Sequence, residues 1–368
     1  MYLKHLTLSN FKNYPEADLE LSPKINCFVG DNGVGKTNLL DAMYYLSFCK
    51  SCFNPQDMQN IRDEEEYFAI HGYYRKNGDQ EDVVSCIQKR GLRKQFRLNR
   101  KDYDRLADHI GLFPLVMVSP GDTDLIGSGS EERRKYLDGV ISQFDRVYLD
   151  NLLVYNRVLQ QRNSLLKQAE DSAMAATALE AWDLQLVDPA HLIHRKRDEF
   201  LREFIPIFQT FFNIISGGRE TVGIAYESQL HTAGLAALLK ESLRRDLLLR
   251  FTTTGIHKDE LSFTIRGLPV RKFGSQGQQK SFLVALRLAQ FEYTRRLKGF
   301  KPLLLFDDIF DKLDEKRVSQ IIRLVGEDNF GQVMITDTHP ERIKQIFREI
   351  QLDHKIFHIT ASNTISCL

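Results

Sequence analysis

Apolar and polar residues alternate near the start of the chain and then give way to a mostly apolar run. Leucines are interleaved with polar residues over 3–8 and 19–21, whereas 25–29 is mostly apolar. Period-two alternation predicts half-buried strands, and a short continuous run predicts a strand buried on both faces. We therefore expect three strands here, followed by a helix over 38–48.

The next part of the chain continues the strand pattern. The stretch 67–99 has strand composition, and we expect turns at Gly72, Gly78 and Gly91 because glycine commonly ends strands at turns. Segment 112–118 is a further apolar strand, which the turn residues Ser-Pro-Gly bring to an end.

The middle of the chain changes to a helical period. Seven apolar residues spaced three and four apart form one stripe over 137–159, which predicts a single long amphipathic helix. A second helical region covers 176–212, and we expect it to be broken or kinked at Asp188-Pro189, which resembles a helix start. Gly217-Gly218 ends this region, so the two helices predict an arm or hairpin.

The last third of the chain alternates strands and helices, which is typical of an α/β domain. The strands are expected at 221–226, 260–266, 302–306 and 332–336, and the helices at 277–297 and 314–325. Because both ends of the chain show α/β alternation, we predict one α/β domain built from 1–128 and 251–368. The helical arm, 129–250, is then an insertion.

Composition and charge narrow the class of protein only slightly. The 368 residues include 50 Lys and Arg and 49 Asp and Glu, so a nucleic-acid binder would have to concentrate its positive charge in patches. No apolar run approaches the roughly 18–20 residues of a membrane helix, and the first residues lack a secretory signal. An odd count of five cysteines favours a reducing compartment, so we expect a cytoplasmic protein. For Cys49 and Cys52 we expect a packing role, with metal or redox use as the alternative.

A phosphate-binding loop is the strongest chemical signal in the sequence. Residues 30–37 match Gly-x-x-x-x-Gly-Lys-Ser/Thr in full, between a predicted buried strand and a predicted helix. Backbone N–H groups and the helix N-terminus attract phosphates, the lysine adds a full charge, and the threonine hydroxyl suits Mg²⁺. The candidate nucleotide-binding residues are Gly30, Asp31, Asn32, Gly33, Val34, Gly35, Lys36 and Thr37, together with Asn38, Lys12 and Asn13.

Two adjacent carboxylates end the apolar strand at 302–306. In phosphate-loop folds such a strand ends beside the loop, so we expect Asp307 to hold Mg²⁺ together with Thr37. Asp308 is then the candidate for orienting or deprotonating the attacking water. Asp is one methylene shorter than the Glu that is usual at this position in ABC-type proteins, so we predict slow hydrolysis.

The segment Ser275-Gln276-Gly277-Gln278 resembles the signature of ABC-type ATPases. The resemblance implies that this segment caps the γ-phosphate held by a second copy of the chain, so that ATP joins two heads. It also places Asp314 in the D-loop and His339 at the switch-histidine position, where a purely structural histidine is the alternative.

Longer segments make the resemblance more specific, and the chain is similar to the RecF family of ABC-type ATPases. The matching segments are LSNFKNY at 8–14, GKTNLL at 35–40, ERRKYLD at 132–138, QRNSLLK at 161–167, GIHKDEL at 255–261 and SQGQQK at 275–280. The chain departs from the family pattern at Gly121, where an acid is usual, at Glu260, where Asp is usual, and near Phe53, where Arg is frequent.

The resemblance implies a DNA-binding protein of recombinational repair and replication restart. Such a protein dimerises on ATP with Mg²⁺, binds single-stranded, gapped and duplex DNA without sequence specificity, and is released by slow, DNA-stimulated hydrolysis. It works with RecR and RecO to load RecA. The alternatives are an SMC-like DNA-bridging ATPase, a transporter subunit and an ATP-linked nuclease.

Seven basic residues between 89 and 101, with no acid among them, form the candidate DNA-binding segment. Phosphate contacts require such local density, although a solvated hairpin face explains it equally well. The candidate contacts are Arg93, Lys94, Arg97, Arg100 and Lys101. For Arg133, Arg134 and Lys135, next to Glu131 and Glu132, we expect an ion-pair face instead.

Overall fold

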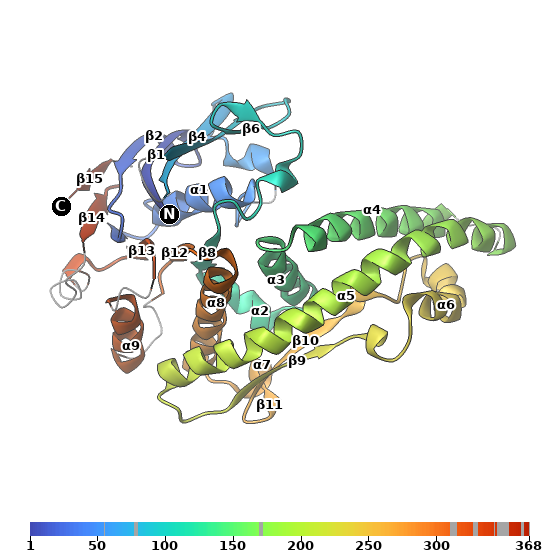
Figure 1. Ribbon diagram of the computed structural model, residues 1–368. Helices are drawn as coiled ribbons and strands as arrows, with labels where there is room; N and C mark the ends of the chain where they lie inside the picture. Colours follow the sequence, from blue (N-terminus) through green and yellow to red (C-terminus); the bar gives the residue numbers. More distant parts are fainter. Residues whose placement is uncertain are drawn as a thin grey trace. The chain divides into compact units, whose positions relative to one another are not determined.

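The chain forms two compact units, drawn in Figure 1. The computed structural model describes residues 1–54, 56–76, 80–168, 172–309, 315–326, 330–341, 343, 353–361 and 364–367. The first unit, here called the head, comprises Met1–Asp122, Ile214–Gly217 and Gln276–Leu368, and the second unit, the arm, comprises Thr123–Asn213 and Gly218–Ser275. The arm is therefore larger than the predicted insertion at 129–250, because the strand that begins at Glu260 pairs with an arm strand.

One sheet of the head is antiparallel and has the order β2-β1-β4-β5-β6-β7. Its strands are β1 (Tyr2–Phe11), β2 (Tyr14–Glu20), β4 (Tyr67–Arg75), β5 (Glu81–Lys89), β6 (Gln95–Leu98) and β7 (Lys101–Asp102). The prediction of a turn at Gly72 is wrong, because Gly72 lies inside β4. Glycine is needed there for close packing, since an added Cβ would lie 2.5 Å from Leu46 Cδ1. Gly91 does occupy a turn, whereas Gly78 lies outside the described residues.

The second sheet of the head has the order β15-β14-β3-β13-β12-β8 and is parallel except for β15. Its strands are β3 (Ile25–Val29), β8 (Leu115–Val118), β12 (Leu303–Phe306), β13 (Val333–Asp337), β14 (His354–Ile359) and β15 (Ile365–Cys367). Strand β13 lies between β3 and β12, so the residues that follow β3 and β12 flank the end of β13. This edge of the sheet positions the candidate site.

Helix α1 (Lys36–Phe48) packs between the two sheets, in contact with β4 and β5 of one and β8 and β13 of the other. Its apolar side chains join both sheets in one buried core. The Gln332 side chain also links the sheets, since its amide exchanges two hydrogen bonds of 2.7 Å with the backbone of Leu3. The other head helices are α8 (Gln276–Lys298) and α9 (Glu315–Gly326), with 3-10 turns at Asp57–Asn60, Leu106–Asp108 and Pro120–Thr123.

The arm is mainly helical, with one small sheet of order β11-β10-β9. Its helices are α2 (Asp124–Gly127), α3 (Ser130–Ser142), α4 (Arg146–Gln168), α5 (Ser172–Ser216, whose end belongs to the head), α6 (Leu235–Leu249) and α7 (Val270–Phe273). Its strands are β9 (Val222–Glu227), β10 (Glu260–Ile265) and β11 (Leu268–Pro269), with 3-10 turns at Gln229–His231 and Ile256–Lys258. Among the helices of the described ranges, none is long and apolar enough to cross a membrane.

The arm helices differ from the expectations at two places. The single helix predicted over 137–159 is divided into α3 and α4, because the Asp145 carboxylate accepts a hydrogen bond of 2.9 Å from Tyr148 N and so begins a new helix. Of the break or kink expected at Asp188-Pro189, the break does not occur, since α5 continues through Pro189. Burial of the neighbouring Ala190 and Ile193 favours the continuous helix over a break.

Candidate nucleotide site

The phosphate loop follows β3 and ends at the first residue of α1. Gly35 has φ 104°, in the left-handed region that suits glycine, and an added Cβ there would lie 2.2 Å from Asn13 Nδ2. At Gly30 an added Cβ would lie 2.4 Å from Ile359 O. The loop is therefore packed closely against its neighbours, while Asp31 and Asn32 at its tip remain exposed.

The Lys36 ammonium closes the phosphate loop. Lys36 is 5% exposed, and its Nζ donates hydrogen bonds to Gly30 O at 2.9 Å and Asp31 O at 2.8 Å. A full positive charge thus lies at the N-terminus of α1, where the helix dipole adds a partial charge of the same sign. This geometry suits a phosphate group.

The hairpin between β1 and β2 braces the loop from the side. Asn13 Nδ2 donates to Val34 O at 3.1 Å, and Asn38 Nδ2 donates to Asn13 Oδ1 at 2.7 Å. Tyr14, which sequence analysis missed, donates its hydroxyl to Gly35 O at 3.2 Å. Asn13 and Asn38, two of the candidate nucleotide-binding residues, therefore lie at the loop.

Lys12 lies in the same hairpin but is engaged elsewhere. Its Nζ forms an ion pair of 2.6 Å with Asp41, a carboxylate of α1 with no exposed surface. The Asp41 carboxylate also accepts hydrogen bonds from Ser51 Oγ at 2.6 Å and Cys52 N at 2.7 Å. The Lys12 ammonium also lies 5.4 Å from the centre of the Phe53 ring. These contacts tie the hairpin and the segment after α1 to Asp41 within the helix.

Three strand ends bring together the groups that would hold a metal ion. Thr37 Oγ1, at the start of α1, donates to both carboxylate oxygens of Asp307 at 2.9 Å. Thr336 Oγ1, in β13, donates to Asp307 Oδ1 at 2.8 Å. Burial raises the pKa of Asp307, and the two hydroxyl hydrogen bonds oppose that rise. A carboxylate and a hydroxyl at one point are oxygen ligands of the kind that Mg²⁺ prefers, so Thr37 and Asp307 fit the ion.

Asp308 follows directly and has an unusual backbone conformation. Its φ is 44°, and its N–H donates to Thr336 Oγ1 at 2.9 Å. Lys280 Nζ donates to Asp308 O at 3.4 Å. Because a left-handed conformation at a non-glycine residue is costly, its occurrence beside the metal-ligand pair favours a functional role for Asp308.

His339 follows β13 and is exposed. Its backbone N–H donates to Asp337 Oδ1 at 2.7 Å, and its ring Nδ1 forms a hydrogen bond of 2.8 Å with Thr338 Oγ1. The ring is 70% exposed, so it is accessible to a bound molecule. The predicted D-loop residue Asp314 lies outside the described residues.

The signature segment begins helix α8. Gln276 is the first residue of the helix, Gly277 and Gln278 follow it, and Ser275 precedes it. Ser275 and Gln276 are exposed. An added Cβ at Gly277 would lie 2.5 Å from Arg317 Nη1, so glycine allows this arginine of α9 to approach the helix start. An exposed helix N-terminus with a serine is suited to an anion.

Comparison with known proteins gives the family. The protein-family model described as the RecF/RecN/SMC N terminal domain matches residues 2–360 of the chain. The DNA replication and repair protein RecF of Phocaeicola vulgatus is 48% identical over 360 residues, which are 98% of this chain and 96% of that protein. The chain belongs to the RecF family. RecF of Flavobacterium johnsoniae is 50% identical over 360 residues, which cover 98% of this chain and all of that protein.

Solved structures agree with this membership of the RecF family. A structure described as the recombination mediator protein RecF-ATPrS in the RecFOR pathway has a TM-score of 0.88 and 29% identity, and covers 100% of this chain and 98% of that one. An Smc head domain from Pyrococcus furiosus has a TM-score of 0.59 at 16% identity, with 100% and 96% coverage, and shows the fold alone. The predicted α/β ABC-type ATPase fold is thus confirmed.

The basic segment of this RecF-family chain is less uniform than its sequence indicates. Lys94 is withdrawn as a candidate DNA contact, because its Nζ is held inside the head by Cys49 O and Asp57 Oδ2, both at 2.7 Å. Only 10% of its side chain is exposed. Arg97 Nε pairs with Asp102 at 2.9 Å, which offsets its charge. The exposed candidates are Arg93, Arg100 and Lys101.

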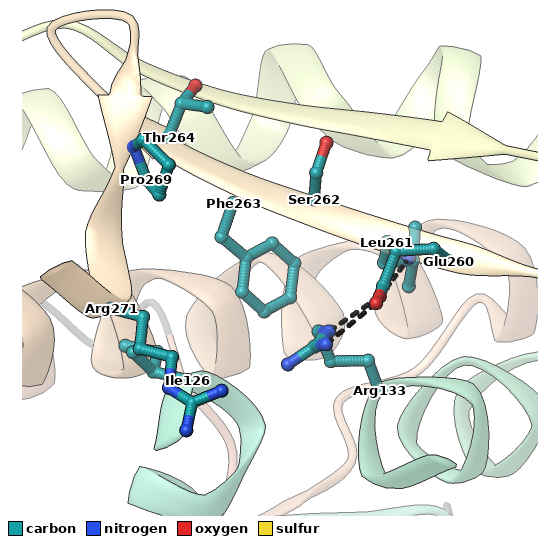
Figure 2. Close-up of a pocket in the computed structure, with 9 residues that line it drawn as sticks. All are labelled: Ile126, Arg133, Glu260, Leu261, Ser262, Phe263, Thr264, Pro269 and Arg271. Carbon is teal, nitrogen blue, oxygen red and sulfur yellow. Dashed lines mark hydrogen bonds and ion pairs between the residues drawn. The ribbon is translucent and has the colours of Figure 1, made fainter. Parts of the chain in front are cut away.

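The ion-pair face expected in the arm of this RecF-family chain is present for Arg133 and Lys135, whereas Arg134 Nη1 donates to the backbone oxygen of Asp259 at 2.6 Å. Lys135 Nζ contacts Glu131 at 2.9 Å and Glu132 at 2.8 Å. Arg133 forms a two-pronged pair with Glu260, at 2.8 and 2.9 Å, so the departure at Glu260 has a partner within the arm. Figure 2 shows this pair at the edge of a cavity of about 180 Å³, in which the Phe263 ring lies centrally.

The Cys-x-x-Cys pair has no metal-binding surroundings in the part of the chain that the structure describes, where no group of three or more His, Cys, Asp or Glu residues converges. Burial raises the pKa of Cys49 to about 12, so this thiol is protonated at neutral pH and is a poor ligand.

Proposed function

We propose that this chain is an ATP-switched DNA-binding protein of recombinational repair and replication restart, acting in the cytoplasm. The pairing of Thr37 with Asp307 beside the Lys36-closed phosphate loop is the observation that carries the nucleotide part of this proposal. Family membership supports the DNA part, since the relatives are named DNA replication and repair protein RecF.

In the proposed mechanism each residue has a separate role. Lys36 and the loop N–H groups bind the phosphates of ATP, and Thr37 and Asp307 hold Mg²⁺. When bound, Mg²⁺ neutralises phosphate charge and orients the nucleotide. Asp308 orients or deprotonates water. His339 is proposed to assist it, since it follows β13, the strand that pairs with β12, and its ring is exposed. Hydrolysis is slow because the Asp308 carboxylate is short.

The signature residues are proposed to act on a second copy. Ser275 and Gln276 are exposed at the start of α8, where they are accessible to the triphosphate of a partner copy. ATP then joins two heads, and hydrolysis separates them and releases DNA. The bound DNA is proposed to be single-stranded or a junction at a gap. RecO and RecR are proposed partners in loading RecA, because the solved relative is described as a mediator in the RecFOR pathway.

Gel filtration tests the proposal in three conditions: without ligand, with ATP and Mg²⁺, and with ATP, Mg²⁺ and gapped DNA. We expect a monomer, a dimer and a DNA-bound dimer, respectively, with ATP hydrolysis increased by DNA. A chain that is monomeric in all three conditions contradicts the switch. Cleavage of the DNA would instead favour a nuclease.

A further inference from the structure

The end of helix α6 and the turn after it form an exposed surface that combines basic and apolar side chains. We call it the α6 patch, and its members are Arg244, Arg245, Leu248, Leu249, Arg250, Phe251 and Lys258. Leu248 is 80% exposed and Phe251 is 41% exposed. The Lys258 ammonium lies 4.9 Å from the centre of the Phe251 ring, which is a cation–π distance. Figure 1 labels α6 within the arm.

The positive charge of the α6 patch is not balanced locally. Among the residues that the structure describes, no carboxylate lies within ion-pair distance of Arg244, Arg245, Arg250 or Lys258. Asp246 lies within the same turn of helix, but its side chain has no exposed surface. The pKa of Lys258 is lowered by burial and by the nearby Arg134 and Arg245, while the buried Asp246 opposes part of that fall. Exposed cations that form no ion pair with a described carboxylate are available to bind phosphates.

A buried network holds the turn that carries this surface. Arg162 Nη1 donates to Asp246 Oδ2 at 2.7 Å and to Thr252 Oγ1 at 2.9 Å, and neither charged side chain is exposed. Asn163 Oδ1 accepts from Thr252 N at 2.8 Å. Thr253 N donates to Asp246 Oδ1 at 2.9 Å. The Gln-Arg-Asn motif thus fixes the backbone on both sides of Arg250 and Phe251, so that the exposed ring does not need to be ordered on binding.

We propose that the α6 patch binds single-stranded nucleic acid, with one base stacked on Phe251 and backbone phosphates contacting Arg244, Arg245, Arg250 and Lys258. Exposed aromatic rings among cations are the usual means by which proteins hold single strands without sequence preference. The choice of nucleic acid as the ligand rests on the proposed function. It places a contact in the arm, whereas the basic segment 89–101 that sequence analysis selected belongs to the head.

The exposed ring favours a nucleic acid over an acidic protein segment. Carboxylates of an acidic segment would satisfy the four cations but would leave the Phe251 ring without a stacking partner. Every nucleotide supplies both a phosphate and a flat base, so one ligand uses both features of the α6 patch.

The test uses the full-length protein and fluorescence anisotropy with two labelled strands of equal length, oligothymidylate and an abasic deoxyribose-phosphate strand. Phe251→Leu keeps an apolar side chain but removes the ring. We expect it to weaken oligothymidylate binding about tenfold and abasic-strand binding less than about twofold. The double substitution Arg244→Gln with Arg245→Gln should weaken both strands and reduce the slope of log affinity against log salt by roughly 1.4, or about 0.7 per lost phosphate contact.

The matched control is Arg195→Gln with Arg202→Gln. It makes the same change in net charge on the exposed face of α5, where each arginine already pairs with a neighbouring acid. Unchanged thermal melting should show that all variants fold. The proposal is overturned if Phe251→Leu affects both strands equally or neither, or if the two double variants behave alike.

Two further outcomes are distinct from these. If polyglutamate displaces the labelled strand as efficiently as unlabelled oligothymidylate at equal charge, the occupant is an acidic protein segment and the proposal is overturned. A wild-type chain that binds neither strand would contradict the proposed DNA-binding function itself, together with this inference.

Discussion

Replacing Asp307 by asparagine should stabilise the head while abolishing its chemistry. The carboxylate is 3% exposed and accepts hydrogen bonds from the hydroxyls of Thr37 and Thr336, and no cation of the described residues forms an ion pair with it. Asparagine has nearly the same shape and keeps one acceptor oxygen. It removes a negative charge that the folded head buries without full compensation.

The direction of the change in the free energy of unfolding follows from the pKa of Asp307, which is raised mainly by burial. A carboxyl group with a higher pKa in the folded state favours folding when it is protonated, and this contribution is lost as the pH rises through the folded-state pKa. At pH 7–8 the ionised group therefore destabilises the head. We expect the substitution to increase the free energy of unfolding by about 1–2 kcal/mol at this pH, and the increase to shrink at acidic pH.

Calorimetry and ATP hydrolysis assays measure the two effects. For a unit of roughly 200 residues, 1–2 kcal/mol corresponds to a rise in Tm of about 3–6 °C. Hydrolysis should fall at least about 100-fold, because a catalytic metal contributes several kcal/mol to the transition state. A lower Tm, or hydrolysis near the wild-type rate, would refute the reasoning.

Asp41→Asn is the matched control for this substitution. Asp41 is equally buried but forms an ion pair of 2.6 Å with Lys12. Removing one member of a buried pair leaves the other charge uncompensated, so the head should lose about 2–4 kcal/mol. If Asp307→Asn stabilises the head and Asp41→Asn destabilises it, then the presence of a paired cation, Lys12, and not burial alone decides the effect.

Three further substitutions test separate parts of the account. Asp308→Glu should raise the rate of ATP hydrolysis, because the longer side chain reaches further toward the attacking water; a slower variant counts against this role. Gly35→Ala should abolish binding of a fluorescent ATP analogue, since the added Cβ would lie 2.2 Å from Asn13 Nδ2; retained binding would contradict the packing of the loop. Asp246→Ala should lower the arm's free energy of unfolding by about 3–5 kcal/mol, because it leaves the buried Arg162 without this partner. The control Asp150→Ala removes a carboxylate from a pair near the surface and should lower it by less than about 1 kcal/mol. Equal losses would refute the importance of the buried pair.

The sequence predicted those features that depend on local pattern. The phosphate loop and the acidic end of β12 follow from short motifs between apolar runs, and the structure places Thr37 and Asp307 in contact. Hydrophobic period could not show the division between α3 and α4, because the apolar stripe continues across the cap at Asp145. Glycine alone likewise could not distinguish a turn from the close approach of Leu46 to Gly72.

The roles of side chains could not be predicted from the sequence where their interaction partners lie far away along the chain. Lys94 belongs to an unbroken basic segment, yet its ammonium is held by Asp57 and by the backbone of Cys49. Arg162 was noted only as part of a motif, although it pairs with Asp246, 84 residues away. Such pairs depend on the tertiary fold, which brings together groups that no local pattern relates.

Sedimentation velocity with Mg²⁺ and a slowly hydrolysed ATP analogue tests most directly whether a signature serine from one copy completes the nucleotide site of another. Ser275→Arg should bind the analogue with wild-type affinity, because Ser275 lies in a different segment from the phosphate loop, and yet sediment as a monomer under conditions in which the wild type is a dimer. A Ser275→Arg protein that dimerises like the wild type would contradict the account.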